Sequence, residues 1–220
     1  MLDAERETIA RACHQLAAEG LVVATAGNVS VRAGEHIAVT PTGCRLAELA
    51  PGDVSVVDLD GRRVAGPLEP TSELLLHLAV HAERGDGAVV HTHAPMSTAV
   101  ACVVDEVPCI HYQLLLLGGA VRVAPYATFG TPELAQAVLA ALADRSAALM
   151  SNHGAVTHSG SLDAALEAML LLEWTCGVYW RACQLGIPRV LDAEQQAAVI
   201  AAAVERRYGA THAARNGDPA

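Results

Sequence analysis

Short segments in which apolar residues alternate with polar ones, or run together between turns, predict the strands of this chain. Val29 and Val31 alternate with Ser30 and Arg32, which is the period of a strand. Gly, Pro or polar turn residues bound each such segment. Strands are expected at residues 29–32, 37–39, 54–57, 88–92 and 147–150.

Apolar residues three and four apart predict the helices, which begin after typical N-cap residues or at proline. In the second of these helices, Leu75, Leu76, Leu78 and Ala79 are expected to face the core. The expected helices begin at Asp3, at Thr71 or Ser72, at Pro95, at Thr131, at Ser161 and at Asp192.

The order of these elements indicates an α/β protein, because strands and helices are interleaved along the chain. No internal repeat and no long linker interrupts the pattern. We therefore expect a single domain over residues 1–209. The polar segment 210–220 is expected to be a flexible C-terminal tail.

Composition excludes several classes of protein. The 220 residues are 52% hydrophobic and 17% charged, which predicts a folded core, and the net charge of −10 argues against nucleic acid or an anionic membrane as a partner. The apolar run 164–180 contains Glu167 and Glu173, so it is expected to be a buried helix. The N-terminal residues do not resemble a signal peptide, which predicts a cytoplasmic protein.

Lysine is absent, and all 14 basic residues are arginine. This excludes a lysine Schiff base, a covalent pyridoxal phosphate linkage and a Walker A loop. The cysteines are scattered without a Cys-x-x-Cys motif, and we interpret them as small buried hydrophobic residues of a reducing cytoplasm.

A histidine pair, His91 and His93, is the strongest candidate for chemistry. Both imidazoles project from one face if the segment is a strand, although such a pair alone is more often an ordinary feature of a strand. Glu73 upstream and His153 downstream are two further candidate ligands. Three histidines and one carboxylate suit Zn²⁺ or a similar metal better than Mg²⁺ or Ca²⁺.

Two turns offer groups that bind anions. Gly27 and Asn28 precede the first expected strand, and Thr42 and Gly43 follow the second. Backbone amides and hydroxyl groups in such turns can hold a phosphate, although an ordinary turn has the same composition.

The ordered set of motifs resembles the zinc-dependent class II aldolase and adducin family from about residue 5 to Tyr208. The similarity is greatest to members that cleave L-fuculose 1-phosphate. The motifs are Thr25-Ala26-Gly27-Asn28-Val29-Ser30, Thr40-Pro41-Thr42-Gly43, Thr71-Ser72-Glu73, His91-Thr92-His93, Ile110-His111-Tyr112, Pro125 to Thr131 and Ser151-Asn152-His153-Gly154.

The resemblance implies a three-layer α/β/α fold around a mostly antiparallel mixed sheet, and a homotetramer with active sites at subunit interfaces. It implies one Zn²⁺ per subunit, with Co²⁺ or Mn²⁺ as alternatives. The implied metal ligands are Glu73, His91, His93 and His153. The implied phosphate site comprises Gly27, Asn28, Thr42, Gly43, Thr71 and Ser72, where Thr71 stands in place of the serine usual in the family.

The implied reaction is cleavage of a ketose 1-phosphate, L-fuculose 1-phosphate or a related 5-deoxy-ketopentose 1-phosphate, to dihydroxyacetone phosphate and an aldehyde. The metal would stabilise an enediolate, Glu73 would act as base, and Tyr112 from a neighbouring subunit would donate a proton. Phe129 would form an aromatic wall for the aldehyde, and Tyr208 would close over the substrate.

Other functions occur on the same scaffold. Ribulose-phosphate 4-epimerases carry aspartate where this chain has Glu73, whereas sugar-phosphate dehydratases and decarboxylases keep glutamate. Adducin, a binding protein, lacks the metal ligands that this chain retains. The sequence leaves the identity of the aldehyde and the native metal open.

Overall fold

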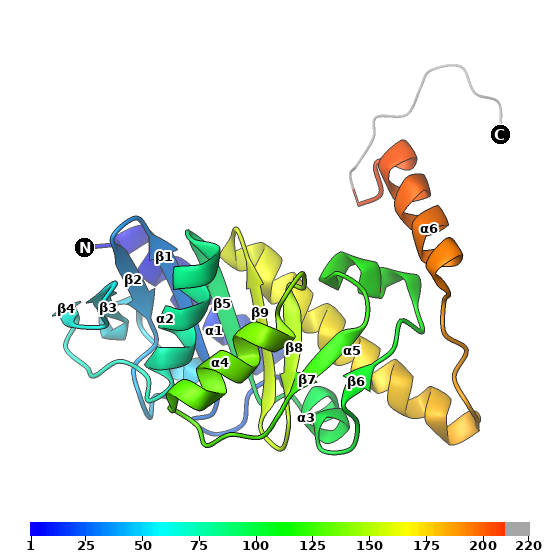
Figure 1. The fold of residues 1–220 in the computed structure, drawn as a ribbon. Helices are drawn as coiled ribbons and strands as arrows, with labels where there is room; N and C mark the ends of the chain where they lie inside the picture. The colour runs from blue at the N-terminus through cyan, green and yellow to red at the C-terminus, as the bar shows by residue number, and fades with distance from the viewer. Residues whose placement is uncertain (210–220) are drawn as a thin grey trace.

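A nine-stranded sheet forms the middle of the computed structural model, which describes residues 1–209 (Figure 1). The strand order is β4-β3-β2-β1-β5-β9-β8-β7-β6, in which β7 and β8 are parallel and the other pairs are antiparallel. The strands are β1 (Asn28–Ala33), β2 (His36–Val39), β3 (Ser55–Asp58), β4 (Arg63–Ala65), β5 (Gly87–Thr92), β6 (Glu106–Val107), β7 (Val121–Ala124), β8 (Ala147–Met150) and β9 (Gly154–Ser159). The expected flexible tail, 210–220, lies outside the described residues.

Helices cover both faces of the sheet, which confirms the expected three layers (Figure 1). Helices α2 and α4 pack together on one face, and α1 and α5 lie on the other. The helices are α1 (Asp3–Ala18), α2 (Leu74–Arg84), α3 (Pro95–Ala101), α4 (Pro132–Ala141), α5 (Leu162–Leu185) and α6 (Ala193–Arg206), with short 3-10 turns η1 (Leu46–Glu48), η2 (Pro51–Asp53) and η3 (Tyr112–Leu117).

Strand β5 lies at the centre and is buried on both faces. Val89 packs into the apolar core beneath α2 and α4, whereas Ala88 and Val90 pack into the core beneath α1 and α5. Because side chains alternate along a strand, His91 projects on the same side as Val89, toward α2. The fold therefore directs the histidine pair toward the helix that follows Glu73.

Four strands were absent from the sequence-based expectation, namely β4, β6, β7 and β9. The most important is β9, which pairs with β5 on one side and with β8 on the other. Its sequence mixes Gly154, Thr157, His158 and Ser159 with only two apolar residues, Ala155 and Val156, so its apolar pattern is weak. The buried Thr157 hydroxyl has a hydrogen-bond partner, because it donates to the carbonyl of Ala165 at 2.8 Å.

Three expectations about helices are wrong. Leu2 rather than Asp3 is the N-cap residue of α1, and no side chain caps that helix. Helix α2 begins at Leu74, with Glu73 as its N-cap residue, rather than after Thr71 or Ser72. Leu75 does not face the core, since 43% of it is exposed. The buried face of α2 instead includes His77 and His81, which lie opposite polar side chains of β1.

Most capping expectations are confirmed. The Thr131 hydroxyl accepts a hydrogen bond from Leu134 N, and the Ser161 hydroxyl accepts one from Ala164 N. At the start of α6, Asp192 and Gln195 form the expected reciprocal capping box. These contacts fix where α4, α5 and α6 begin.

The apolar run 164–180 lies within α5, as expected, and no helix within residues 1–209 has both the length and the apolar character needed to cross a membrane. The Glu173 carboxylate on α5 accepts hydrogen bonds from the Met96 and Ser97 amides at 2.7 and 2.8 Å. This helix therefore uses its acidic residue to hold the start of α3.

The cysteines follow the expected pattern only in part. Cys13, Cys109 and Cys176 are buried, and burial raises the pKa of the Cys176 thiol to about 12. Cys102 and Cys183, in contrast, are exposed.

Candidate active site

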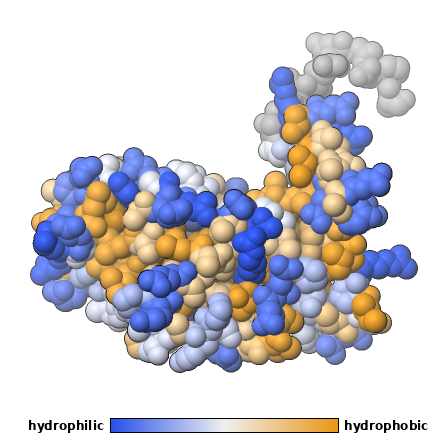
Figure 2. Space-filling model, in the orientation of Figure 1, coloured by the Kyte–Doolittle hydropathy of each residue, from blue (hydrophilic) through white to orange (hydrophobic). Residues whose placement is uncertain are grey.

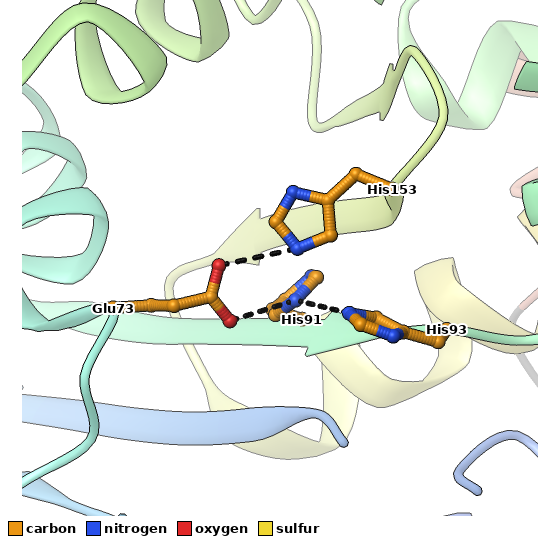
Figure 3. Close-up of side chains that lie close together, drawn as sticks. All are labelled: Glu73, His91, His93 and His153. Carbon is orange, nitrogen blue, oxygen red and sulfur yellow. Dashed lines mark hydrogen bonds and ion pairs between the residues drawn. The ribbon is translucent and has the colours of Figure 1, made fainter. Parts of the chain in front are cut away.

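Four side chains from separate parts of the chain meet at one end of the central strands (Figure 3). Glu73 immediately precedes α2, His91 is in β5, His93 follows β5, and His153 is in the turn between β8 and β9. One candidate ligand atom from each residue lies within 4.8 Å of all the others. The structure thus brings the four predicted ligands together.

The Glu73 carboxylate contacts two of the histidines, one through each of its oxygen atoms (Figure 3). Its Oε2 atom is 3.0 Å from His91 Nε2, and its Oε1 atom is 3.2 Å from His153 Nε2. His93 Nε2 lies 3.1 Å from His91 Nε2. Three nitrogen atoms and one carboxylate therefore converge on a single point, as in a zinc site.

The protonation of His91 follows from its hydrogen bond to the backbone. His91 Nδ1 lies 2.9 Å from the carbonyl oxygen of Ala155, which can only accept, so Nδ1 carries the hydrogen. The other ring nitrogen, Nε2, is the atom directed at Glu73 and His93, and in the neutral ring it carries the lone pair that a metal would bind. Imidazole nitrogens and a carboxylate that converge in this way make a donor set that fits a metal.

The other site groups are held in the forms that a metal requires. Burial, with a smaller contribution from the nearby His91 and His153 rings, lowers the pKa of His93 to about 4, so His93 is neutral at pH 7. Burial alone would raise the pKa of Glu73, but hydrogen bonds with His153, His91 and Asn28 outweigh it and lower that pKa below its usual value. Glu73 is therefore an anion.

Close backbone contacts make this convergence possible. A Cβ atom on Gly154 would collide with the carbonyl oxygen of Thr92 and lie 3.0 Å from the His93 ring. A Cβ atom on Gly27, whose φ is +93°, would lie 3.0 Å from the His91 carbonyl oxygen. Glycine at these two positions lets neighbouring backbones approach the histidine strand.

A cleft of about 280 Å³ opens above the four ligands. All six residues of the predicted phosphate site line it, together with Phe129, Glu73, His93 and His153. No lysine or arginine is among its lining residues within 1–209. The cleft is further lined by Thr25, Ala26, Pro41, Tyr126, Ala127 and Asn152.

Thr42 and Thr71 offer their hydroxyl groups to this cleft rather than their amides. The amide of Thr42 donates to the Glu69 carbonyl, and the amide of Thr71 donates to the Thr40 carbonyl, each at 3.0 Å. The Thr71 hydroxyl accepts from the Glu73 amide at 3.2 Å, which leaves its own hydrogen free to donate.

Tyr112 and Tyr208 do not lie in this cleft of their own chain. Their hydroxyl groups are 3.1 Å apart, and both residues line a larger, mainly apolar groove of about 510 Å³ between η3 and α6. Their hydrogen bond raises the pKa of Tyr112. The expectation that Tyr112 reaches the site of a neighbouring subunit stays a prediction.

The family described as Class II Aldolase and Adducin N-terminal domain matches residues 7–180. The chain belongs to the class II aldolase family. A 5-methylthioribulose-1-phosphate/5-deoxyribulose-1-phosphate aldolase of Rhodospirillum rubrum is 41% identical to it over 197 residues, covering 89% of each chain. An L-fuculose phosphate aldolase of Escherichia coli strain K12 is 36% identical over 202 residues, covering 89% of this chain and 94% of that one.

A solved structure agrees with these sequence relatives. An L-fuculose 1-phosphate aldolase superposes with a TM-score of 0.86 at 31% identity, over 93% of this chain and 97% of that chain. The class II aldolase fold predicted from the motifs is therefore confirmed.

This class II aldolase also contains polar residues near the site to which no role was assigned from sequence. His77 and His81 are fully buried on α2, and Ser30 on β1 lies between them. Histidines four residues apart on an otherwise apolar helix face were the available signal. Asn152 lines the cleft in a left-handed conformation, φ 54°, which asparagine tolerates better than most residues.

Proposed function

We propose that this class II aldolase cleaves the C3–C4 bond of a ketose 1-phosphate to give dihydroxyacetone phosphate and a short aldehyde. The observation that carries the proposal is the convergence of Glu73, His91, His93 and His153 at the cleft that contains the predicted phosphate-binding residues. The names of the relatives at 41% and 36% identity support the same substrate class.

We propose Zn²⁺ as the metal, held by these four residues, with Co²⁺ or Mn²⁺ as substitutes. Bound there, a divalent metal would supply the positive charge that stabilises the enediolate left after bond cleavage. A lysine cannot replace it, because the chain has none.

Two residues would handle protons. Glu73, an anion in the cleft, would take or return the proton at C3 or its hydroxyl group. Tyr112 of a neighbouring subunit would take the C4 hydroxyl proton in the cleavage direction and return it in synthesis. A raised pKa favours the protonated phenol, which is the form that Tyr112 needs when it returns the proton in the synthesis direction.

The substrate phosphate would be held without side-chain cations. The hydroxyl groups of Thr42, Thr71 and Ser72 and the backbone around Gly27 and Gly43 surround one part of the cleft. Such neutral donors bind a phosphate dianion through several short hydrogen bonds.

The aldehyde end would lie against Phe129, with Tyr126 and Ala127 beside it. L-Fuculose 1-phosphate and 5-deoxyribulose 1-phosphate share the phosphate half, and both leave an aldehyde that ends in a methyl group. They differ by one hydroxyl-bearing carbon, so the apolar wall suits either substrate.

We further propose a homotetramer in the cytoplasm that acts in carbohydrate metabolism. Helix α6 stands away from the body and has no buried residue (Figure 1). Ile200 and Val204 are exposed on it, and apolar surface is visible on this helix in Figure 2. A neighbouring subunit would cover this surface. Tyr112 would then reach into the cleft of that subunit, and Tyr208 would close over the substrate there.

The test is release of dihydroxyacetone phosphate from L-fuculose 1-phosphate and, in parallel, from 5-deoxyribulose 1-phosphate. Release should stop after chelator treatment and resume when Zn²⁺ is returned. The ratio of kcat/KM for the two substrates would identify the preferred aldehyde. A metal-loaded, folded protein that cleaves neither substrate would overturn the proposal and direct attention to dehydration, decarboxylation or epimerisation.

A further inference from the structure

We propose that His77 is a positioning residue that, with Ser30 and His81, fixes the direction of the Asn28 side-chain amide and thereby holds Glu73 in place. The inference deepens the proposed function, because Glu73 is both a proposed metal ligand and the proposed base. It assigns a purpose to histidines that touch neither the metal site nor the cleft.

A continuous chain of hydrogen bonds leads from Glu73 into the protein. Asn28 Nδ2 donates to Glu73 Oε2 at 2.9 Å, and Asn28 Oδ1 lies 2.5 Å from His77 Nε2. Ser30 Oγ then lies 2.7 Å from His77 Nδ1 and 2.8 Å from His81 Nε2. Each link of this polar chain is within hydrogen-bonding distance.

The residue spacing on β1 and on α2 produces this series of hydrogen bonds. Asn28 and Ser30 are two apart on β1, so their side chains share the face that lies beneath α2. His77 and His81 are four apart on α2, so they lie one above the other on its buried face. Arg32, the next residue on that face of β1, donates to the His81 carbonyl at 2.8 Å and fastens the end of the helix.

The direction of every hydrogen bond follows from the carboxylate. Anionic Glu73 accepts only, so the NH₂ group of Asn28 must face it and Oδ1 must face His77. His77 Nε2 must therefore carry a hydrogen. Burial lowers the pKa of His77 to about 3, so the ring is neutral and Nδ1 is an acceptor.

The remaining links are then determined. The Ser30 hydroxyl donates to His77 Nδ1 and accepts from His81 Nε2. His81 Nδ1, which has no partner within residues 1–209, ends the chain as an acceptor. A rotated Asn28 amide would place its oxygen against the Glu73 oxygen and its NH₂ group against the His77 N–H.

Burial raises the energetic cost of reversing the Asn28 amide. Ser30, His77 and His81 have no exposed surface, so surface water does not substitute for a lost partner. An unpaired polar group in such a place is costly, and a reversed amide would create two unfavourable contacts at once. This series of hydrogen bonds therefore disfavours any orientation of the Asn28 amide other than the one that donates to Glu73.

The test compares three variants that separate hydrogen bonding from packing. His77→Gln keeps one donor and one acceptor in about the same places, whereas His77→Leu removes both. Val80→Ala, at a fully buried neighbour on α2, is the control for loss of packing alone. Ser30→Ala interrupts the chain one link further on and replaces His77→Leu should that variant not fold.

The first readout is the Zn²⁺ dissociation constant, measured by competition with a chelating dye in the absence of substrate. His77→Leu should weaken Zn²⁺ binding by about 10- to 100-fold, the usual loss when a partner of a metal ligand is removed. His77→Gln and Val80→Ala should bind Zn²⁺ as the wild type does. Binding by folded His77→Leu that matches the wild type would overturn the proposal, as would an equal loss in Val80→Ala.

The second readout is ¹⁵N NMR of histidine-labelled wild-type protein, which reports which ring nitrogen carries the hydrogen. The proposal requires the Nε2–H form of His77, and the Nδ1–H form would contradict it. Neither readout depends on sugar-phosphate cleavage. Failure of the wild type to cleave any ketose phosphate would therefore count against the proposed function and leave this inference to be judged on its own.

Discussion

The Nε2 atoms of His91 and His93 lie 3.1 Å apart. Because His91 donates its Nδ1 hydrogen to the Ala155 carbonyl, Nε2 is the atom directed at His93 and at the Glu73 carboxylate. A metal held by these groups would link β5 to the start of α2, and this has consequences for stability as well as for activity.

Removing the metal should lower the melting temperature. A ligand at a thousandfold excess over its dissociation constant stabilises a protein by about 4 kcal/mol, which corresponds to a shift on the order of 10 °C for a chain of this size. Thermal melts with chelator and with added Zn²⁺ measure the shift. His93→Ala should lose the response to Zn²⁺, and identical melts for metal-free and metal-loaded wild type would contradict the prediction.

Glu73→Gln should reduce activity more than metal binding. The amide keeps the size and one oxygen ligand of the carboxylate, but it cannot accept a proton, so kcat should fall by at least about 100-fold. Zinc content by mass spectrometry and kcat on the better substrate measure the two effects. His153→Ala is the comparison, since it should lose metal and activity together. A Glu73→Gln enzyme with near-normal kcat would exclude the base role.

The metal-free protein should lose stability as pH falls below about 6.5. Burial lowers the pKa of His77 to about 3 and of His81 to about 4, so between pH 6.5 and 4 the unfolded chain binds protons that the folded chain does not. Each histidine then lowers the free energy of unfolding by up to about 1.4 kcal/mol for each unit by which the pH falls. Stability is restored as pH rises, the sign expected of a lowered histidine pKa.

Urea unfolding at several pH values and a fixed protein concentration measures this slope. His81→Gln places a side chain that cannot be protonated at this position, so the slope of the unfolding free energy against pH should fall by the amount that corresponds to about one proton. A slope that is the same in His81→Gln and wild type would show that these buried rings do not cause the acid sensitivity.

Mixed oligomers should regain activity if Tyr112 serves a neighbouring subunit. Glu73→Gln and Tyr112→Phe homo-oligomers should each be weakly active, but mixing the unfolded chains and refolding them together creates some sites with both wild-type residues. Activity above the sum of the two parents is the expected result. Refolding each variant alone is the control, and no gain on mixing would place both residues in one subunit's site.

The cluster of Glu73, His91, His93 and His153 was predictable because each candidate ligand has a short local signature. His91 and His93 are adjacent to an apolar strand segment, and His153 is next to Gly154, so residue type and position both carried information. The cleft was predictable for the same reason, since its turns have hydroxyl and glycine residues close together.

The buried face of α2 was not predictable from apolar spacing. Leu75 and Leu76 look equivalent in sequence, yet one is exposed and the other buried, because β1 presents Asn28 and Ser30 rather than apolar side chains to the helix. Strand β9 was missed because its place between two strands, which buries it, is a property of the whole sheet. Both features depend on contacts between distant segments.

The cleft has two walls of different origin. Its reactive groups are anchored by the sheet and by α2, whereas Tyr126 and Phe129 belong to the loop between β7 and α4 and are mostly exposed. Substitutions of Tyr126 and Phe129 would leave the apolar cores intact, because neither side chain packs into them. A lineage carrying this protein could therefore acquire a new aldehyde preference by drift or selection in one surface segment, while the bond-breaking half of the enzyme stays as it is.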